Sequence, residues 1–225
     1  MTGKYQSDRI PTSKGDLVMT FLGHGSLMLT FEGKTIHVDP YSEAADYTGI
    51  PKADLIILTH DHYDHLDPAA YDAVWKDGAT TVWTKSCEGK VKNCVFLANG
   101  ETKTVLGLTI EAVPAYNVVH RRPDGQPFHP KGYGNGYIIT FGDKRVYLGG
   151  DTENIPEMEN LERIDVAFLP MNLPYTMTPE MVAEAARTFR PKILYPYHYG
   201  ETDPARLVDL LKDEKEIEVR IRDLR

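Results

Sequence analysis

Short apolar runs separated by turn-forming residues characterise the start of the chain. Residues 17–22, 27–31 and 34–38 form three such runs, divided by Gly23-His24-Gly25-Ser26 and by Glu32-Gly33. This pattern predicts an antiparallel meander of three strands. Residues 54–58 form a largely apolar run that ends directly before Thr59-His60. A short run of this kind predicts a strand covered on both faces.

The rest of the chain alternates between strand-like and helix-like patterns, as in an α/β protein. Helices are expected at residues 69–75, from Thr178-Pro179 to Arg190-Pro191, and at 204–211, because proline at a first turn and a 3.6-residue apolar period favour them. Further strands are expected at residues 80–84, 108–113, 136–141, 145–148, 166–169, 193–197 and 217–221. Residues 116–135, rich in Pro, Gly, Arg and His, are too long for a simple connection and predict a functional flap.

The densest chemistry follows the fourth predicted strand. His60, Asp61, His62, Asp64 and His65 bring three imidazoles and two carboxylates into six positions. Imidazole and carboxylate are the usual ligands of zinc and related ions. A solvated polar loop is the alternative interpretation, but the number of available ligands favours a metal site.

The spacing His60-x-His62-x-Asp64-His65 resembles the HxHxDH signature of the metallo-β-lactamase superfamily. Asp39, Asp151 and His198 follow the family order after predicted strands, so the resemblance extends over nearly the whole chain. The Gly23–Ser26 turn and the short length are similar to the branch that contains ascorbate-6-phosphate lactonase. The resemblance implies a four-layer αββα sandwich with metals at one edge, between its two sheets. The length of 225 residues suits one domain over residues 1–225.

The same resemblance implies a set of metal ligands. His60, His62 and one further histidine would hold a first ion, and Asp64, His65 and His198 a second, with Asp151 bridging. Two zinc ions are expected, with manganese or another divalent metal as the alternative. Many relatives place the further histidine shortly after an alanine that closes a strand, but Asn117 stands there in this sequence. We therefore expect His129 on the flap to supply the ligand, with His120 as the second choice.

The other site candidates have a structural interpretation beside the functional one. Asp39 precedes Pro40 and either forms a turn or orients a ligand histidine. His24 is favoured as a hairpin residue, with contact to substrate or support of a metal ligand as the alternatives. Asn117 is assigned to the surroundings of the metals or of the substrate. The basic flap residues, Arg121, Arg122 and Lys131, are candidates for binding a phosphate or carboxylate, although exposed basic loops are often merely solvated.

Composition narrows the classes of partner. The net charge is -8, with 33 acidic and 25 basic residues, which disfavours nucleic acid and anionic membranes as partners. No apolar run approaches the roughly 20 residues of a membrane helix. The start lacks the apolar core of a secretion signal, so we expect a cytoplasmic protein, or a periplasmic or secreted one if a signal segment was trimmed. Cys87 and Cys94 are expected to be free thiols, and a homo-oligomer stays open.

These observations predict a metal-dependent hydrolase. A metal pair lowers the pKa of bound water from about 15.7 toward 7, so that hydroxide attacks the substrate. We expect a small ester, lactone or phosphodiester, and the substrate can be an anion. Asp64 or Asp151 would accept or return the proton. His62, where oxygen-reducing diiron relatives carry an acidic residue, argues against redox chemistry, and Asp151, where several β-lactamases carry cysteine, argues against antibiotic hydrolysis. The alternatives are a metal-binding sensor or scaffold without catalysis and, less favoured, a nuclease.

Overall fold

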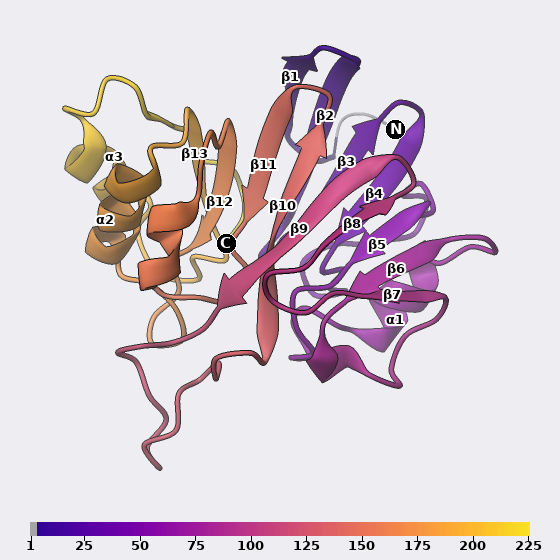
Figure 1. Cartoon of the computed structure of the whole chain (residues 1–225), viewed down its shortest axis with the longest axis horizontal. Helices are drawn as coiled ribbons and strands as arrows, with labels where there is room; N and C mark the ends of the chain where they lie inside the picture. The colour runs from indigo at the N-terminus through magenta and orange to yellow at the C-terminus, as the bar shows by residue number, and fades with distance from the viewer. Residues whose placement is uncertain (1–3) are drawn as a thin grey trace.

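Two seven-stranded sheets form the centre of the computed structural model, which describes residues 4–225 (Figure 1). The first sheet has its strands in chain order: β1 (Ser7–Thr12), β2 (Gly15–Gly23), β3 (Ser26–Phe31), β4 (Lys34–Val38), β5 (Leu55–Ile57), β6 (Thr80–Trp83) and β7 (Cys94–Phe96). Strands β1 to β4 are antiparallel neighbours, whereas β4 to β7 are parallel.

The second sheet repeats this plan. Its strands are β8 (Thr102–Val105), β9 (Leu108–Ala115), β10 (Gly134–Phe141), β11 (Lys144–Leu148), β12 (Val166–Pro170), β13 (Ile193–Tyr197) and β14 (Glu218–Val219), again neighbours in chain order. Strands β8 to β11 are antiparallel, and β11 to β14 are parallel. Each half of the chain therefore begins as a meander and continues as strands that point the same way.

The two sheets pack face to face through alternating apolar side chains. Along β2, Leu17, Met19 and Phe21 are buried at every second position, as a strand with one core face requires. The ring of Phe21 lies 5.2 Å from that of Tyr195 in the opposite sheet, and Phe31 meets Phe141 edge-on at 5.3 Å. The main core thus lies between the sheets.

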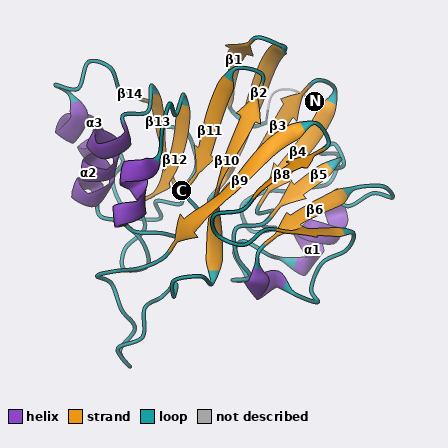
Figure 2. Ribbon diagram, viewed as in Figure 1, coloured by secondary structure: helices purple, strands orange, loops and turns teal. Residues whose placement is uncertain are grey.

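Helices cover the outer faces (Figure 2). Helix α1 (Pro68–Val74) buries Tyr71 and Val74 in a second apolar cluster with Ile56 and Leu58 of the first sheet. Helices α2 (Pro179–Phe189) and α3 (Ala205–Leu211) cover the second sheet, where the ring of Phe189 packs edge-on against Tyr147 at 5.7 Å. Two short 3-10 helices lie at Lys85–Cys87 and Pro156–Asn160. The layers are those of the αββα sandwich that the resemblance implies.

Most predicted elements are confirmed with small shifts of their bounds. The meander, the strand before His60 and the helix capped by Thr178 are all present, and the Thr178 hydroxyl accepts from the Met181 N–H at 3.2 Å. Three strands were not predicted, namely β1, β7 and β8. The strand expected at residues 217–221 is wrong in extent, because pairing with β13 is limited to Glu218–Val219. Both cysteines are free thiols.

The carboxyl ends of the parallel strands lie at one edge of the sandwich. The loops after β5, β11, β12 and β13 emerge there, together with the β2–β3 hairpin and the flap between β9 and β10. Ligand sites of α/β sheets usually form at such an edge, because loops from several strands meet there. Within residues 4–225, no helix combines the length and apolarity that crossing a bilayer requires.

Candidate metal centre

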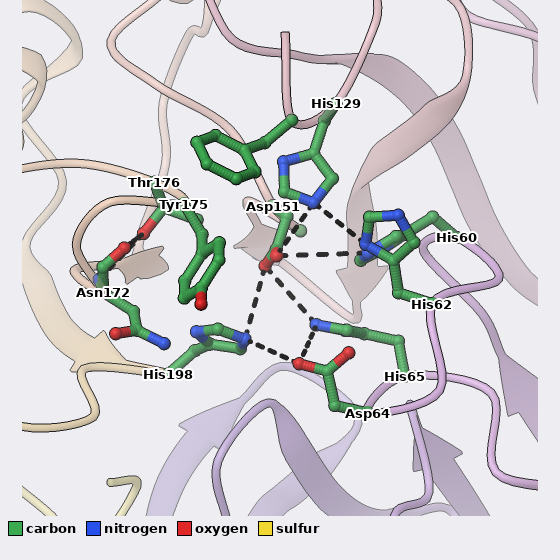
Figure 3. Close-up of polar contacts among 12 residues, drawn as sticks. His60, His62, Asp64, His65, His129, Asp151, Asn172, Tyr175, Thr176 and His198 are labelled. Carbon is green, nitrogen blue, oxygen red and sulfur yellow. Dashed lines mark hydrogen bonds and ion pairs between the residues drawn. The ribbon is translucent and has the colours of Figure 1, made fainter. Parts of the chain in front are cut away.

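Seven side chains from both halves of the chain surround one point at this edge (Figure 3). The imidazoles and carboxylates that gather there belong to His60, His62, Asp64, His65, His129, Asp151 and His198. All except His62 and Asp64 are buried. The predicted site residues that carried the family signature are therefore brought together, although they lie up to 138 positions apart in the chain, from His60 to His198.

A tight turn separates the members of the HxHxDH segment. The carbonyl of His62 accepts hydrogen bonds from the N–H groups of His65, at 3.0 Å, and Leu66, at 2.8 Å. The turn places His60 and His62 on one side and Asp64 and His65 on the other. Asp67 then caps α1 by accepting from the Ala69 N–H at 2.8 Å.

The first histidine group consists of His60, His62 and His129. The Nε2 atom of His129 lies 3.2 Å from Nδ1 of His62 and 3.2 Å from Oδ2 of Asp151. Nε2 of His60 lies 4.0 Å from the same Asp151 oxygen. One carboxylate oxygen of Asp151 thus faces this group.

The second group consists of Asp64, His65 and His198, and it faces the other oxygen of Asp151. Oδ1 of Asp151 lies 3.4 Å from Nε2 of His65 and 3.8 Å from Nε2 of His198. Oδ2 of Asp64 lies 3.3 Å from Nε2 of His198 and 3.0 Å from Nε2 of His24. His24, expected as a hairpin residue, a substrate contact or a support of a metal ligand, is close enough to join this group.

The spacing of these nitrogen and oxygen atoms, and the lack of hydrogen-bond partners for several of them, suit a divalent ion. Within residues 4–225, Nε2 of His60, Nε2 of His65 and Oδ1 of Asp151 are buried without a hydrogen-bond partner. Buried polar atoms are normally paired, so each such atom requires an explanation. Two ligands about 2.0–2.1 Å from one tetrahedral ion stand about 3.3 Å apart, close to the separations of 3.2–3.4 Å found in both groups. The residues therefore fit a divalent metal ion such as zinc.

The electrostatics of the cluster also suit a cation. Burial alone raises the pKa of the Asp151 carboxyl, but the imidazoles of His198, His65 and His129 hold it well below its usual range. Burial likewise raises the pKa of Asp64, and hydrogen bonds from His198 and His24 more than reverse this effect. Both carboxylates therefore stay ionised.

The two central imidazoles titrate in opposite directions. Burial and the neighbouring His65 hold the pKa of His60 well below its usual range, so its ring is neutral. Burial also lowers the pKa of His65, but the surrounding carboxylates, that of Asp151 first, raise it to about 10. The proton on His65 thus balances part of the buried negative charge, which is the charge that a bound dication would take over.

Asp39 orients both of these imidazoles. It is fully buried, and its Oδ2 accepts from Nδ1 of His65 at 2.8 Å and from the Thr59 hydroxyl at 2.6 Å. Because the only hydroxyl proton of Thr59 points to Asp39, Thr59 Oγ1 accepts from Nδ1 of His60 at 3.1 Å. In both rings Nδ1 carries hydrogen, and in the neutral ring of His60 this leaves Nε2 unprotonated toward the centre. Asp39 therefore orients His65 directly, and His60 through Thr59, while it lies on the far side of both rings from the centre of the cluster.

The two flap histidines that could complete the first histidine group, His129 and His120, have different surroundings. His129 belongs to the first histidine group, whereas Nδ1 of His120 donates to Oε1 of Glu153 at 2.6 Å and the ring lies in no potential metal cluster of the described residues. Glu153 was not anticipated from the sequence. Its position two residues after Asp151, at the same strand end, is the only sequence signal that could have indicated it.

The basic residues of the flap also separate. Lys131 pairs with Glu157 at 2.5 Å, and a guanidinium N–H of Arg121 donates to the Gly125 carbonyl at 3.1 Å, so neither lines the cavity over the metal centre. Arg122 does line it, with its guanidinium 5.1 Å from the ring of Phe128.

That cavity has a volume of about 360 Å³. Its floor is the metal centre, and its walls are the flap, through Arg122 and Phe128, and the loop after β12, through Asn172 and Tyr175. The rings of Phe128 and Tyr175 meet edge-on at 5.1 Å. A space of this size accommodates a small molecule.

Comparisons with known proteins agree with this arrangement. The family model described as "Beta-lactamase superfamily domain" matches residues 18–198. A UPF0173 metal-dependent hydrolase of Thermus thermophilus is 34% identical over 200 residues, which cover 83% of this chain and 85% of the relative. A Parabacteroides distasonis protein, solved as a candidate metal-dependent hydrolase, is 52% identical with a TM-score of 0.93, over 98% of this chain and 100% of that one. Igni18, a metallo hydrolase of Ignicoccus hospitalis, is 25% identical with a TM-score of 0.76, over 92% and 95% of the two chains.

Proposed function

Since the chain belongs to the β-lactamase superfamily, whose domain model spans most of its length, we propose that it is a metal-dependent hydrolase that cleaves a small anionic ester, lactone or phosphodiester. We further propose two ions, with zinc as the expected metal. His60, His62 and His129 would hold the first ion, Asp64, His65 and His198 the second, and Asp151 both. The observation that carries this proposal is the position of the two Asp151 oxygens, which face different histidine groups.

Bound divalent ions would supply a water of pKa about 7 and would polarise the substrate oxygen. The chain itself supplies the proton acceptor, for which we propose Asp64. Both Asp64 and Asp151 line the cavity, but the side chain of Asp64 is 18% exposed, whereas that of Asp151 is 4% exposed and lies between the two histidine groups. A general base must reach the reacting group, which favours the more exposed carboxylate.

Arg122 supports an anionic substrate. It is the flap arginine that lines the cavity, and within residues 4–225 it pairs with no carboxylate. Its Nη2 donates to the Phe128 carbonyl at 3.3 Å, which holds the guanidinium beside the aromatic wall. A guanidinium in this position can bind a phosphate or carboxylate through its remaining N–H groups.

The metal assignment is tested by counting zinc in variants. The wild-type protein should bind two zinc ions per chain and hydrolyse at least one member of a panel of lactones, phosphodiesters and esters. His62→Ala should lose one ion and reduce turnover to background. His120→Ala is the matched control and should keep two ions, because its ring lies outside the cluster. Two bound ions without turnover across the panel would instead favour a metal-binding sensor or scaffold.

The substrate class is tested with Arg122→Ala and the neighbouring control Arg121→Ala. For an anionic substrate, loss of charged hydrogen bonds should lower kcat/KM by about 10- to 100-fold in Arg122→Ala. A neutral substrate of the same size should be hydrolysed as well as by the wild type. Equal losses on both substrates would exclude anion recognition by Arg122.

A further inference from the structure

The side-chain amide of Asn117 is fixed on all sides at the base of the flap. Its Nδ2 donates to Oε1 of Glu153 at 3.0 Å and to the carbonyl of Tyr175 at 2.9 Å. Its Oδ1 accepts from the backbone N–H of His129 at 2.8 Å. A carboxylate and a carbonyl only accept hydrogen bonds and a backbone N–H only donates, so the amide has one orientation that satisfies every partner.

This orientation determines the state of a neighbouring ring. Nδ1 of His129 lies 2.8 Å from the same Asn117 oxygen. Because that oxygen cannot donate, Nδ1 of His129 must carry the hydrogen. In the neutral ring the lone pair is then on Nε2, the atom that lies 3.2 Å from Nδ1 of His62 and 3.2 Å from Oδ2 of Asp151.

Glu153 holds this arrangement from behind. The side chain is fully buried, and its carboxylate accepts from the backbone N–H groups of Val118, Val119 and His120 at 2.5–2.7 Å, in addition to the Asn117 amide. The first turn of the flap is thus folded around one carboxylate. Because Glu153 follows Asp151 by two residues, the flap is anchored to the loop that presents the carboxylate between the two histidine groups.

We propose that Asn117, held by Glu153, is a positioning residue that fixes the tautomer of His129 and directs its Nε2 into the first metal site. A histidine at position 117 would itself supply a metal ligand. Here Asn117 and Glu153 instead hold His129, which lies later on the flap, in position as the ligand. The inference rests on the proposed function only for the identity of the ion, since the tautomer is a property of the metal-free chain.

The first experiment therefore uses metal-free protein labelled with ¹⁵N-histidine. Long-range ¹H–¹⁵N correlation spectra distinguish a protonated ring nitrogen from a bare one. In the wild type, at mildly alkaline pH, His129 should carry hydrogen on Nδ1. Asn117→Ala, which removes the acceptor, should lose this preference. A wild-type ring that carries no hydrogen on Nδ1 would overturn the inference, whether or not any variant folds.

The second experiment measures zinc affinity by competition with a chelator. Loss of the partner that orients a ligand histidine typically weakens metal binding by about 10- to 100-fold. Asn117→Ala should show this loss for one of two zinc equivalents. The control Asn154→Ala, which removes a contact of 2.8 Å to Glu184 outside the cluster, should bind both normally. Unchanged affinity for both equivalents in folded Asn117→Ala would contradict the proposal. A wild type that binds no zinc would contradict the proposed function, while the tautomer spectrum would still decide this inference.

Discussion

Replacing Asp39 by asparagine should move the ring hydrogen of His60 from Nδ1 to Nε2 and remove the Nδ1 hydrogen of His65, without changing the shape of the core. Oδ1 of Asp39 accepts from the backbone N–H of Thr59 at 2.8 Å, so an amide must keep its oxygen there and place its NH₂ group where Oδ2 stood. That NH₂ group would then donate to His65 Nδ1 and to the Thr59 hydroxyl, both of which donate to Oδ2 in the wild type.

The consequence reaches both metal positions. With Nδ1 of His65 accepting, the hydrogen that remains on the ring lies on Nε2, the atom that faces Asp151. The Thr59 hydroxyl proton is released to His60 Nδ1, which moves the hydrogen of that ring to Nε2 as well. Each misdirected ligand should weaken zinc binding by about 10- to 100-fold, or about 1.4–2.7 kcal/mol. Since both rings share Thr59 and Asp39, the two losses should not be simply additive.

The measurement is a chelator competition on Asp39→Asn and on Asp54→Asn. Asp54 is a matched control, because it also accepts a backbone N–H, from Thr35 at 2.8 Å, and pairs with Lys76 away from the metal centre. Asp54→Asn should bind zinc as the wild type does, and thermal melts should show that both variants fold. If Asp39→Asn binds two zinc ions with wild-type affinity, the control of these tautomers by Asp39 is refuted.

Two further predictions concern stability. Removing zinc with a chelator should lower Tm by about 8–16 °C. Zinc at about a thousand times Kd contributes about 4 kcal/mol to the free energy of unfolding, and each kcal/mol shifts the Tm of a protein of this size by about 2–4 °C. An unchanged Tm would mean that no ion stabilises the fold. Asp8, whose carboxylate meets the Arg222 guanidinium at 2.6 Å, has a pKa that burial alone would raise but that hydrogen bonds from Tyr195 and Arg222 lower. Its contribution to stability is therefore present above the unfolded pKa of about 3.9 and lost as pH falls through the folded value. Asp8→Asn should cost about 1–3 kcal/mol at neutral pH, and urea titrations should show the difference shrinking in acid; a difference that grows in acid would refute this sign.

The cluster of histidines and carboxylates could be predicted from the sequence because its members follow strand ends. His60, Asp151 and His198 each follow a short apolar run, and the carboxyl ends of parallel strands meet at one edge. The spacing of the HxHxDH segment is local, so it survives any uncertainty about where the strands begin and end. Residues with these properties were brought together as the pattern indicates.

Other features depend on tertiary contacts and leave little trace in the sequence. In β1 only Ile10 is buried, and β7 and β8 are short edge strands that carry mostly polar or exposed residues. These three strands therefore lack the alternation of apolar residues from which a strand is predicted. The choice between His120 and His129 is similar, because both lie on the same flap. What separates them is the carboxylate of Glu153, which binds His120 and holds Asn117 against His129. That choice is made by a residue from another strand end.

The histidines proposed as ligands differ in the contacts that hold their rings in place. His60, His65 and His129 each have a hydrogen-bond partner for Nδ1, whereas Nδ1 of His198 is buried without one within residues 4–225. His198 is held instead by its backbone and by packing: its N–H donates to the His24 carbonyl at 3.2 Å, and its ring lies 3.8 Å from that of His24.

The backbone N–H of His24 donates to the Arg225 carbonyl at 3.0 Å, and this hydrogen bond anchors the β2–β3 hairpin. Gly25 completes this contact: a Cβ there would lie 3.2 Å from a ring carbon of His65 and 3.9 Å from His198. A side chain at position 25 would press against the ring of His65, whereas its distance to His198 would be an ordinary van der Waals contact. The Gly23–Ser26 turn between β2 and β3 therefore lies in contact with both His198 and Arg225.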